Sequence, residues 1–338
     1  MEQQLLKQVL REYDEKRNKA IFEANMRKNE LLKSNSKLAE IESKLSSISI
    51  QSAKEILKAD NKNSTAILNN LKKQTSALLK EKNTILKELS SEKDLLNPQF
   101  ECSLCKDSGY INSSMCNCLK QKIFDIAYNK SNIGNLSKEN FSNFNMKLFS
   151  DKPDRSKFNS DISPRANMQI LKERAEYFVN NFDNPEEKNL IFTGDTGIGK
   201  TFLTNCIANE ILKQGKVVLY QTAPVMFDYL IDEKFGKSTS NLFQNVLEAD
   251  LLIIDDLGTE KITNQINDLK FEELFTIINT RLLNQNHKVT KTIISTNLNV
   301  KELFEIYTDR IGSRLAGHYD FLRFFGDDIR FKKTKKEM

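Results

Sequence analysis

Residues 194–201 read Gly-Asp-Thr-Gly-Ile-Gly-Lys-Thr, and this stretch decides the fold of the C-terminal half of the chain. It fits the pattern G-x-x-x-x-G-K-[ST], in which glycines let the backbone turn tightly and aim its N–H groups at phosphate oxygens. An apolar run (residues 189–192, NLIF) precedes it, and residues 202–212 carry apolar side chains at helical spacing. We therefore predict a phosphate-binding loop between a strand and a helix N-terminus, with Lys200 reaching the β- and γ-phosphates of a nucleoside triphosphate. The residues predicted to surround the nucleotide are Gly194, Asp195, Thr196, Gly197, Ile198, Gly199, Lys200, Thr201 and Phe202.

A second motif, residues 251–256 (LLIIDD), is an apolar strand that ends in two acids. Asp255 comes first after the apolar run and is the predicted ligand of Mg²⁺, together with the Thr201 hydroxyl. Asp256 is predicted to polarise the attacking water, and the alternative is a helix N-cap or turn residue. Glu260 is a third acid whose position suits a solvated loop equally well. Loop and acids together predict a nucleoside-triphosphate site.

The composition fits a soluble protein of more than one domain. The chain has 338 residues, which is too long for one small core. Of these residues, 39% are apolar and 29% are charged. No run approaches the roughly 20 apolar residues that span a bilayer. Residues 1–16 carry charges throughout and lack the apolar segment of a signal peptide, so we expect a cytoplasmic protein. The net charge of +5 permits contact with nucleic acid without demanding it.

The first 97 residues contain neither glycine nor proline and are predicted to form long helices of the coiled-coil type. An antiparallel pair would turn near 46–49 or 60–63. These residues carry an apolar stripe that must be covered. The stripe packs on itself, on a second copy of the chain, or on a partner protein, and self-packing is the most common of the three. Its spaced members are Leu31, Leu38, Leu45, Leu68, Leu71, Leu78, Ile85 and Leu89. The side chains most suspected of meeting a partner are Leu5, Leu6, Val9 and Leu10.

Four of the five cysteines follow within 17 positions: Cys102, Cys105, Cys116 and Cys118. The cysteines form a C-x-x-C pair and a C-x-C pair that are ten residues apart. This spacing suits a closed, structural zinc site with four thiolate ligands, known as a zinc knuckle. Gly109 falls between the two pairs, where the backbone of such a knuckle must reverse direction. An iron–sulfur cluster and a redox pair are the alternatives. The fifth, Cys206, follows the phosphate loop and is predicted to be a buried apolar residue.

A polar linker and an alternating pattern complete the chain. Phe141, Phe144 and Phe149 are expected to anchor the linker on the next domain, the alternative being stacking on single-stranded nucleic acid. Ser163 and Pro164 predict the start of a helix running to about residue 182. Strands are predicted near 189–194, 216–222, 250–256, 291–296 and 321–325, with helices between them. This pattern predicts a parallel α/β sheet with ligands at the carboxyl ends of its strands.

Together these features resemble the AAA+ ATPases and, more narrowly, the DnaC/DnaI-type replicative helicase loaders of bacteria. The resemblance covers most of the chain, and the cysteine cluster ahead of the ATPase core narrows it to the loaders. The motifs that carry it are GDTGIGKT (194–201), LLIIDDLG (251–258), STN (295–297), DRIGSRL (309–315) and SPRANM (163–168). It implies ATP, Mg²⁺ and Zn²⁺ as cofactors, and the replicative helicase, single-stranded DNA and further copies of the chain as partners.

The resemblance also implies roles for single residues. Lys200 and Thr201 would act in the Walker A motif, and Asp255 and Asp256 in Walker B. Asn297 is similar to sensor 1, which detects the γ-phosphate.

Three arginines extend this set. Arg314 is similar to the arginine finger, which reaches into a neighbouring subunit's nucleotide site, because a guanidinium stabilises transition-state charge through several planar donors. Arg310 is its close competitor, and a surface salt bridge is the alternative for either. Arg281 is a further candidate for a subunit interface.

The expected organisation is a partner-binding helical region (1–97), a zinc knuckle (98–127), a linker (128–162), an AAA+ core without a lid (163–331) and a basic tail (332–338). The expected absence of a lid suggests a weak ATPase that depends on assembly or DNA. The expected function is helicase loading during replication initiation or restart, as part of a primosome. One alternative is a transposition helper ATPase of the IstB kind that acts with a transposase. Another is a non-catalytic ATP-dependent scaffold.

Overall fold

The computed structural model describes residues 2–58, 74–86, 97–127, 139–238, 241–259, 264–284 and 288–330. Several predictions fall on residues beyond these ranges: those on Glu260, on residues 60–63, on Leu68, Leu71 and Leu89, and on the tail 332–338. The chain divides into two units, residues 10–111 and residues 112–338 with the first nine residues. In the part of the chain that is described, no helix is long and apolar enough to cross a membrane.

The larger unit is built on a five-stranded parallel sheet in the order β4-β5-β6-β3-β7. Its strands are β3 (Asn189–Thr193), β4 (Val218–Thr222), β5 (Leu251–Leu257), β6 (Lys291–Thr296) and β7 (Tyr319–Arg323). All five strands expected from the apolar runs are therefore present. The parallel direction brings the polar residues that follow each strand to one edge of the sheet.

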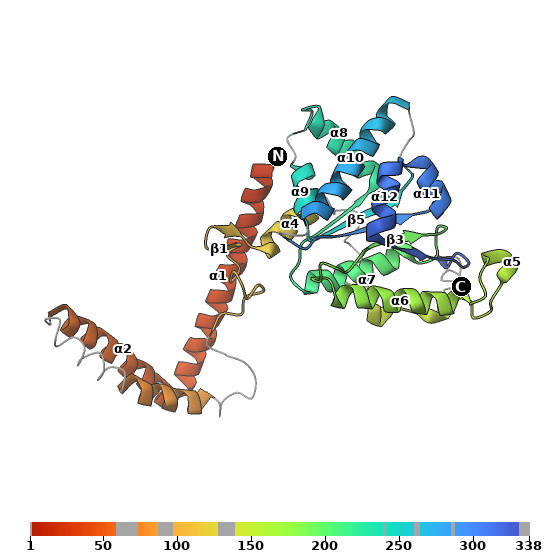
Figure 1. Cartoon of the computed structure of the whole chain (residues 1–338). Coiled ribbons are helices and arrows are strands. Elements are labelled where there is room, and N and C mark those ends of the chain that lie inside the picture. The colour runs from red at the N-terminus through yellow and green to blue at the C-terminus, as the bar shows by residue number, and fades with distance from the viewer. Residues whose placement is uncertain are drawn as a thin grey trace. The chain divides into compact units, whose positions relative to one another are not determined.

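Helices cover both faces of this sheet (Figure 1). One face carries α6 (Pro164–Asn180) and α7 (Lys200–Lys213). The other face carries α8 (Ala223–Lys234), α9 (Leu242–Glu248), α10 (Asn264–Leu283), α11 (Val300–Ile306) and α12 (Asp309–His318).

Alternate side chains of each strand enter different cores. Leu251 and Ile253 pack toward α6 and α7, whereas Leu252 and Ile254 pack toward α8 to α12. Because side chains alternate along a strand, a strand buried on both faces needs an unbroken apolar run, and the sequence of β5 provides one.

The N-terminal region consists of α1 (Glu2–Ser34), α2 (Ser36–Lys58) and helical residues 74–86. The predicted turn near 46–49 is wrong, because these residues lie inside α2, where Ser47 and Ser49 donate to the carbonyls of Ser43 and Leu45. The helix breaks instead at Asn35, whose side chain accepts from the N–H of Leu38. Serine hydroxyls satisfied in this way are compatible with a continuous helix.

The second of these helices makes an ion pair with the helical residues that follow it. Lys82 Nζ lies 2.6 Å from Glu42 Oε1, and both side chains are mostly buried. Leu38 is also buried, which agrees with a self-packing stripe. Of the side chains suspected of meeting a partner, Val9 is fully buried within the chain, so that prediction is wrong for this residue.

The segment after these helices forms a small hairpin, β1 (Tyr110–Ile111) with β2 (Ser114–Met115), and then α4 (Asn117–Ala127). α4 is fastened to β4, the edge strand of the large sheet. The side-chain amide of Gln121 accepts from the Val218 N–H (2.7 Å) and donates to the Val218 carbonyl (3.0 Å). One side chain thus takes the place of a neighbouring strand, which an edge otherwise leaves unpaired.

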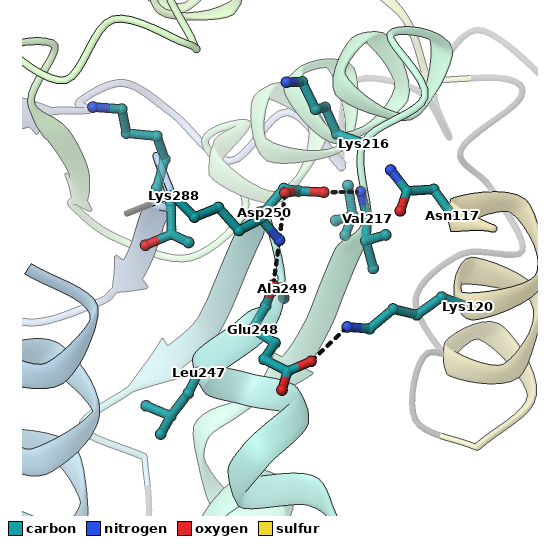
Figure 2. Close-up of polar contacts among 12 residues, drawn as sticks. Asn117, Lys120, Lys216, Val217, Leu247, Glu248, Ala249, Asp250 and Lys288 are labelled. Carbon is teal, nitrogen blue, oxygen red and sulfur yellow. Dashed lines mark hydrogen bonds and ion pairs between the residues drawn. The ribbon is translucent and has the colours of Figure 1, made fainter. Parts of the chain in front are cut away.

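Charged side chains reinforce this junction at the base of the sheet (Figure 2). Lys120 of α4 lies 2.8 Å from the carboxylate of Glu248. Buried Asp250, just before β5, accepts from the Val217 N–H (2.7 Å) and pairs with Lys288 (2.8 Å). These contacts fix the beginnings of β4 and β5 relative to α9.

The stretch before α6 packs on the larger unit, as predicted. It contains two short 3₁₀ helices, η2 (Phe141–Asn143) and η3 (Met146–Leu148), and α5 (Arg155–Phe158). Phe149 is buried, and the Phe144 ring packs edge-on against Phe202 with centroids 5.3 Å apart. The buried Phe149 ring is therefore unavailable for stacking on nucleic acid.

Candidate functional site

The glycine-rich loop lies between β3 and α7, as the sequence predicted. Gly199 caps α7 with φ +101°, and Gly194 and Gly197 also have positive φ, which favours glycine at all three positions. A Cβ on Gly194 would lie 2.3 Å from the Phe324 carbonyl oxygen, so a side chain there has no space. Ile198 is buried and holds the loop to the core. The loop therefore has the shape that the phosphate-binding prediction requires.

Lys200 is the buried cation of this loop, and only 6% of it is exposed. Its ammonium donates to the carbonyls of Gly194 (2.5 Å) and Asp195 (2.6 Å) and to Oδ1 of Asn297 (2.8 Å). Burial lowers the pKa of Lys200, and the nearby carboxylates of Asp255 and Asp256 oppose that shift. The carbonyl acceptors are neutral, so an anionic phosphate would be a stronger partner for this charge.

The second acid motif lies beside the loop because β5 and β3 both flank β6. Asp255 is buried, and its Oδ2 accepts from the Tyr220 hydroxyl at 2.7 Å while its Oδ1 accepts from the Asp256 N–H at 3.1 Å. Burial and the neighbouring Asp255 charge raise the pKa of Tyr220, so the phenol stays protonated as a donor. The fit to Mg²⁺ is good, since a buried carboxylate oriented by a fixed donor is a hard oxygen ligand.

Tyr220 is a site residue that motif reading misses. It lies inside the predicted strand 216–222, where an aromatic residue is ordinary. Tyr220 could have been identified because a buried tyrosine hydroxyl needs a hydrogen-bond partner. The strand that ends in two acids is the neighbour of β4 in the sheet and supplies that partner.

Asp256 differs from Asp255 in both backbone and surroundings. It is exposed and has φ +55°, in the left-handed region that aspartate tolerates better than most residues. Partial burial and the Asp255 charge raise the pKa of Asp256, and Lys200 opposes this. The N-cap alternative is not supported, because Asp256 lies inside β5. Its carbonyl accepts from the Thr259 hydroxyl and N–H, which makes it part of a turn as well.

The structure brings Lys200, Asp255, Asp256 and Asn297 to one edge of the sheet, with Thr201 exposed at the start of α7. Arg314 instead lies on α12 and donates to Oδ1 of Asn279 on α10 at 2.9 Å. Arg310 lines a separate hollow of about 460 Å³ with Phe271 and Phe275.

The prediction that Arg281 lies at a subunit interface is wrong. Its side chain is 2% exposed and donates to the carbonyls of Val246, Ala249 and Lys291 inside the chain. Burial lowers the pKa of Arg281 to about 10. It is a structural residue that satisfies carbonyls between α9 and β6.

The four cysteines form the second candidate site. Their Sγ atoms all lie within 4.8 Å of one another, a spacing that fits one tetrahedral metal ion. Gly109 has φ +76°, as a reversal at this point requires. Buried Asp107 accepts from the N–H groups of Glu101 (2.9 Å) and Cys102 (2.8 Å) and so shapes the first half of the site. These ligands fit Zn²⁺, which would hold the segment together without taking part in a reaction.

Comparison with known proteins agrees with this geometry. The model of the IstB-like ATP binding protein family matches residues 145–337, more than half of the 338 residues, so the chain belongs to that family. The predicted AAA+ fold class and ATPase class are confirmed by this membership. The match starts after the helices and the cysteine cluster, which lie outside it.

Individual relatives cover part of the chain. A putative insertion sequence ATP-binding protein, y4pL of Sinorhizobium fredii, is 27% identical over 153 residues, which is 44% of this chain and 59% of that protein. The putative ATP-binding protein of insertion sequence IS232 from Bacillus thuringiensis is 22% identical over 192 residues, 55% of this chain and 72% of that protein. The chain thus spans less than two thirds of y4pL. A crystal structure of the DnaC helicase loader is 22% identical, covers 57% of this chain and 99% of its own, and gives a TM-score of 0.41.

Proposed function

We propose that this member of the IstB-like ATP-binding family is an ATP-dependent loader of a replicative DNA helicase. The helicase is bound through the N-terminal helices and the cysteine knuckle, and is placed on single-stranded DNA. The observation that carries the proposal is the pairing of Gln121 with both backbone groups of Val218, since it joins the knuckle's helix to the ATPase sheet. A client held by residues outside the family match is thereby connected to the nucleotide site.

The nucleotide chemistry follows from the residues at the sheet edge. ATP binding replaces the carbonyl partners of Lys200 with phosphate oxygens, and Asn297 is positioned to respond because it shares that ammonium at 2.8 Å. Thr201 and Asp255 would hold Mg²⁺, which neutralises phosphate charge when bound. In this proposal Asp256, an exposed carboxylate next to Asp255, orients the attacking water.

Turnover is expected to be weak in the single chain and to rise on assembly. Arg314 lies on α12 and donates to Oδ1 of Asn279 on α10 at 2.9 Å. In this proposal its guanidinium completes the nucleotide site of a neighbouring copy. Zn²⁺ at the four cysteines supports the client-binding segment by fixing its fold.

A second candidate is an ATPase that assists a transposase. It is favoured by the names of two relatives, both insertion-sequence ATP-binding proteins, and by the family itself. The two candidates share the ATP site and differ in the client.

The test is to offer the full-length chain, with and without ATP, two clients separately: the replicative helicase and a transposase of the same organism. We expect helicase retention that a zinc chelator or a Cys105→Ser/Cys116→Ser variant abolishes. Transposase retention without helicase retention would establish the second candidate.

A Lys200→Ala variant separates the modules. We expect it to lose ATP binding and to keep helicase binding, and simultaneous loss of both from a folded protein would contradict the proposal. Wild-type client loading by an Asp256→Asn variant that does not hydrolyse ATP would instead indicate a scaffold.

A further inference from the structure

Strand β6 carries a buried hydroxyl group that has no hydrogen-bond partner. Ser295 is 1% exposed, and its Oγ makes no hydrogen bond with any residue that the structure describes. A buried, unpaired hydroxyl costs free energy, because water would satisfy it in the unfolded chain. Such groups are few in folded proteins, and each calls for an explanation.

The pairing of the strands places this hydroxyl opposite the two acids of the LLIIDD motif. Residues 254–257 of β5 run beside residues 294–296 of β6, so β5 has one residue more over the same stretch. This is a β-bulge, in which Asp255 and Asp256 together lie opposite Ser295. Bulges are common next to active sites, where they redirect side chains.

Ser295 faces the same side of the sheet as Asp255. Side chains alternate along a strand, and Ile293, two residues before Ser295, packs in the core under α6 and α7. Asp255 lies on this side too, because Tyr220, which donates to it, belongs to the same core. Asn297, two residues after Ser295, accepts from the ammonium of the phosphate-loop lysine at 2.8 Å. The unpaired hydroxyl therefore lies between the core and the phosphate loop, next to the predicted metal ligand.

The Asp255 carboxylate can accept a further hydrogen bond. The Tyr220 hydroxyl donates to Oδ2 at 2.7 Å, and the Asp256 N–H donates to Oδ1 at 3.1 Å. A carboxylate has about four acceptor positions, so two donors leave positions for a third donor and for a metal ion. A serine hydroxyl suits the third position because it rotates to meet an acceptor. Donors of this kind orient carboxylates that bind metals.

We propose that Ser295 is a positioning residue of the Mg²⁺ site, and that its hydroxyl donates to the Asp255 carboxylate when nucleotide and metal are bound. The proposal rests on ATP and Mg²⁺ binding at the loop, as argued above. Without them the unpaired hydroxyl lowers the stability of the chain, and with them it gains the partner that it lacks. Ser295 thus gives up stability in the empty chain for affinity toward the metal.

The experiment is thermal unfolding of the full-length chain in three solutions: without nucleotide, with saturating ADP and EDTA, and with saturating ADP and Mg²⁺. We expect Ser295→Ala to raise Tm without nucleotide, because the unpaired hydroxyl is gone. The effect of ADP in EDTA should match that in wild type. The Mg²⁺ concentration that gives half of the metal-dependent rise in Tm should increase about fivefold, as expected for the loss of one ordinary hydrogen bond.

Thr292→Val is the matched control, because Thr292 is a buried hydroxyl residue of the same strand that has a partner. It accepts from Arg281 Nε at 3.0 Å, near the end of β6 that is away from the loop. This variant should lower Tm equally in all three solutions and leave the Mg²⁺ dependence unchanged. Ser295→Thr is the conservative variant. It keeps the hydroxyl, so it should keep the wild-type Mg²⁺ dependence even where the added methyl group lowers Tm.

Two results would overturn the proposal while leaving ATP binding intact. A lower Tm of Ser295→Ala without nucleotide would show that the hydroxyl already has a partner. An unchanged Mg²⁺ dependence in Ser295→Ala would show that the hydroxyl does not act on the metal site. If ADP failed to stabilise wild type, or stabilised Lys200→Ala equally, the proposed function would fail, and the role of Ser295 with it.

Discussion

The Tyr220 hydroxyl donates a 2.7 Å hydrogen bond to Oδ2 of Asp255, and both side chains are buried. The donor comes from the middle of β4 and the acceptor from β5, the neighbouring strand, so the sheet itself fixes the distance. The Asp256 N–H donates to the other oxygen, Oδ1, at 3.1 Å, so the two donors together set the direction in which the carboxylate faces. This relationship gives Asp255 the second-layer support that metal-binding carboxylates generally have.

We predict that Tyr220→Phe raises the Mg²⁺ concentration needed for ATP turnover by roughly three- to tenfold, because the carboxylate loses its orienting donor. The variant also leaves a buried carboxylate oxygen without that partner, which costs about 1–3 kcal/mol of unfolding free energy. Mg²⁺ titration of ATP hydrolysis and thermal unfolding measure the two effects.

Tyr319→Phe is the control for this prediction. Tyr319 is buried at the start of β7, and burial raises its pKa to about 12 despite a hydrogen bond with Thr292. It should lose stability without any change in Mg²⁺ dependence, because it lies at the opposite end of the sheet. Equal Mg²⁺ dependence in both tyrosine variants would contradict a role for Tyr220 at Asp255.

Asp256→Asn should abolish turnover and stabilise the fold. A water-polarising carboxylate contributes about 100-fold or more to rate, so its loss should lower kcat at least that much while ATP binding persists. The pKa of Asp256 is raised in the folded chain, so between the unfolded and folded pKa values the folded state binds more protons. The carboxylate therefore destabilises the fold increasingly as pH rises through that window, and fully at neutral pH.

The stability gain of Asp256→Asn should accordingly be present at pH 7 and disappear in acid below the unfolded pKa of aspartate, about 4. Asparagine also accepts the φ of +55° found here. Denaturant unfolding at several pH values measures the difference. A gain that grows toward acid pH would show that the sign is wrong.

The four clustered cysteines and Cys206 should differ in their reactivity toward a thiol reagent. Loaded with Zn²⁺, the chain should release one metal ion when a chelator is added, and the four clustered thiols should then react with a thiol reagent. Cys206 should stay unreactive until the chain unfolds, because it is fully buried and burial raises its pKa to about 12. Metal release should increase as pH falls, since the ligands are thiolates.

Metal analysis and thiol counting on the native chain check this division. A visible chromophore with iron bound would favour the iron–sulfur alternative. A disulfide between two of the four would favour the redox pair.

The strands of the large sheet and the phosphate loop could be predicted because short stretches of sequence specify them. Every strand of the sheet was marked by an apolar run, and the phosphate loop by glycines whose positive φ the structure bears out. These features depend on neighbours in sequence. The break at Asn35 was missed because asparagine and serine occur both inside and between helices, and the choice depends on which backbone groups they satisfy.

Features made by distant parts of the chain gave no such signal. Gln121 and Val218 are 97 positions apart in the sequence. Nothing in the sequence around a helical glutamine indicates that its side chain pairs with the backbone of a strand. The prediction for Arg281 was wrong because the carbonyls that its side chain satisfies come together only in the folded sheet.

The Gln121 pairing gives the last prediction. Gln121→Leu keeps side-chain volume but leaves the Val218 N–H and carbonyl on the edge of β4 without that partner. We expect a loss of about 1 kcal/mol of unfolding free energy and faster hydrogen exchange at the Val218 amide. Lys120→Ala, one residue away, removes a partly exposed ion pair with Glu248 and should change stability by less than about 0.5 kcal/mol. Unchanged exchange at Val218 in Gln121→Leu, with the protein folded, would show that α4 is not held by this amide, and the link between the knuckle and the ATPase sheet would have to run elsewhere.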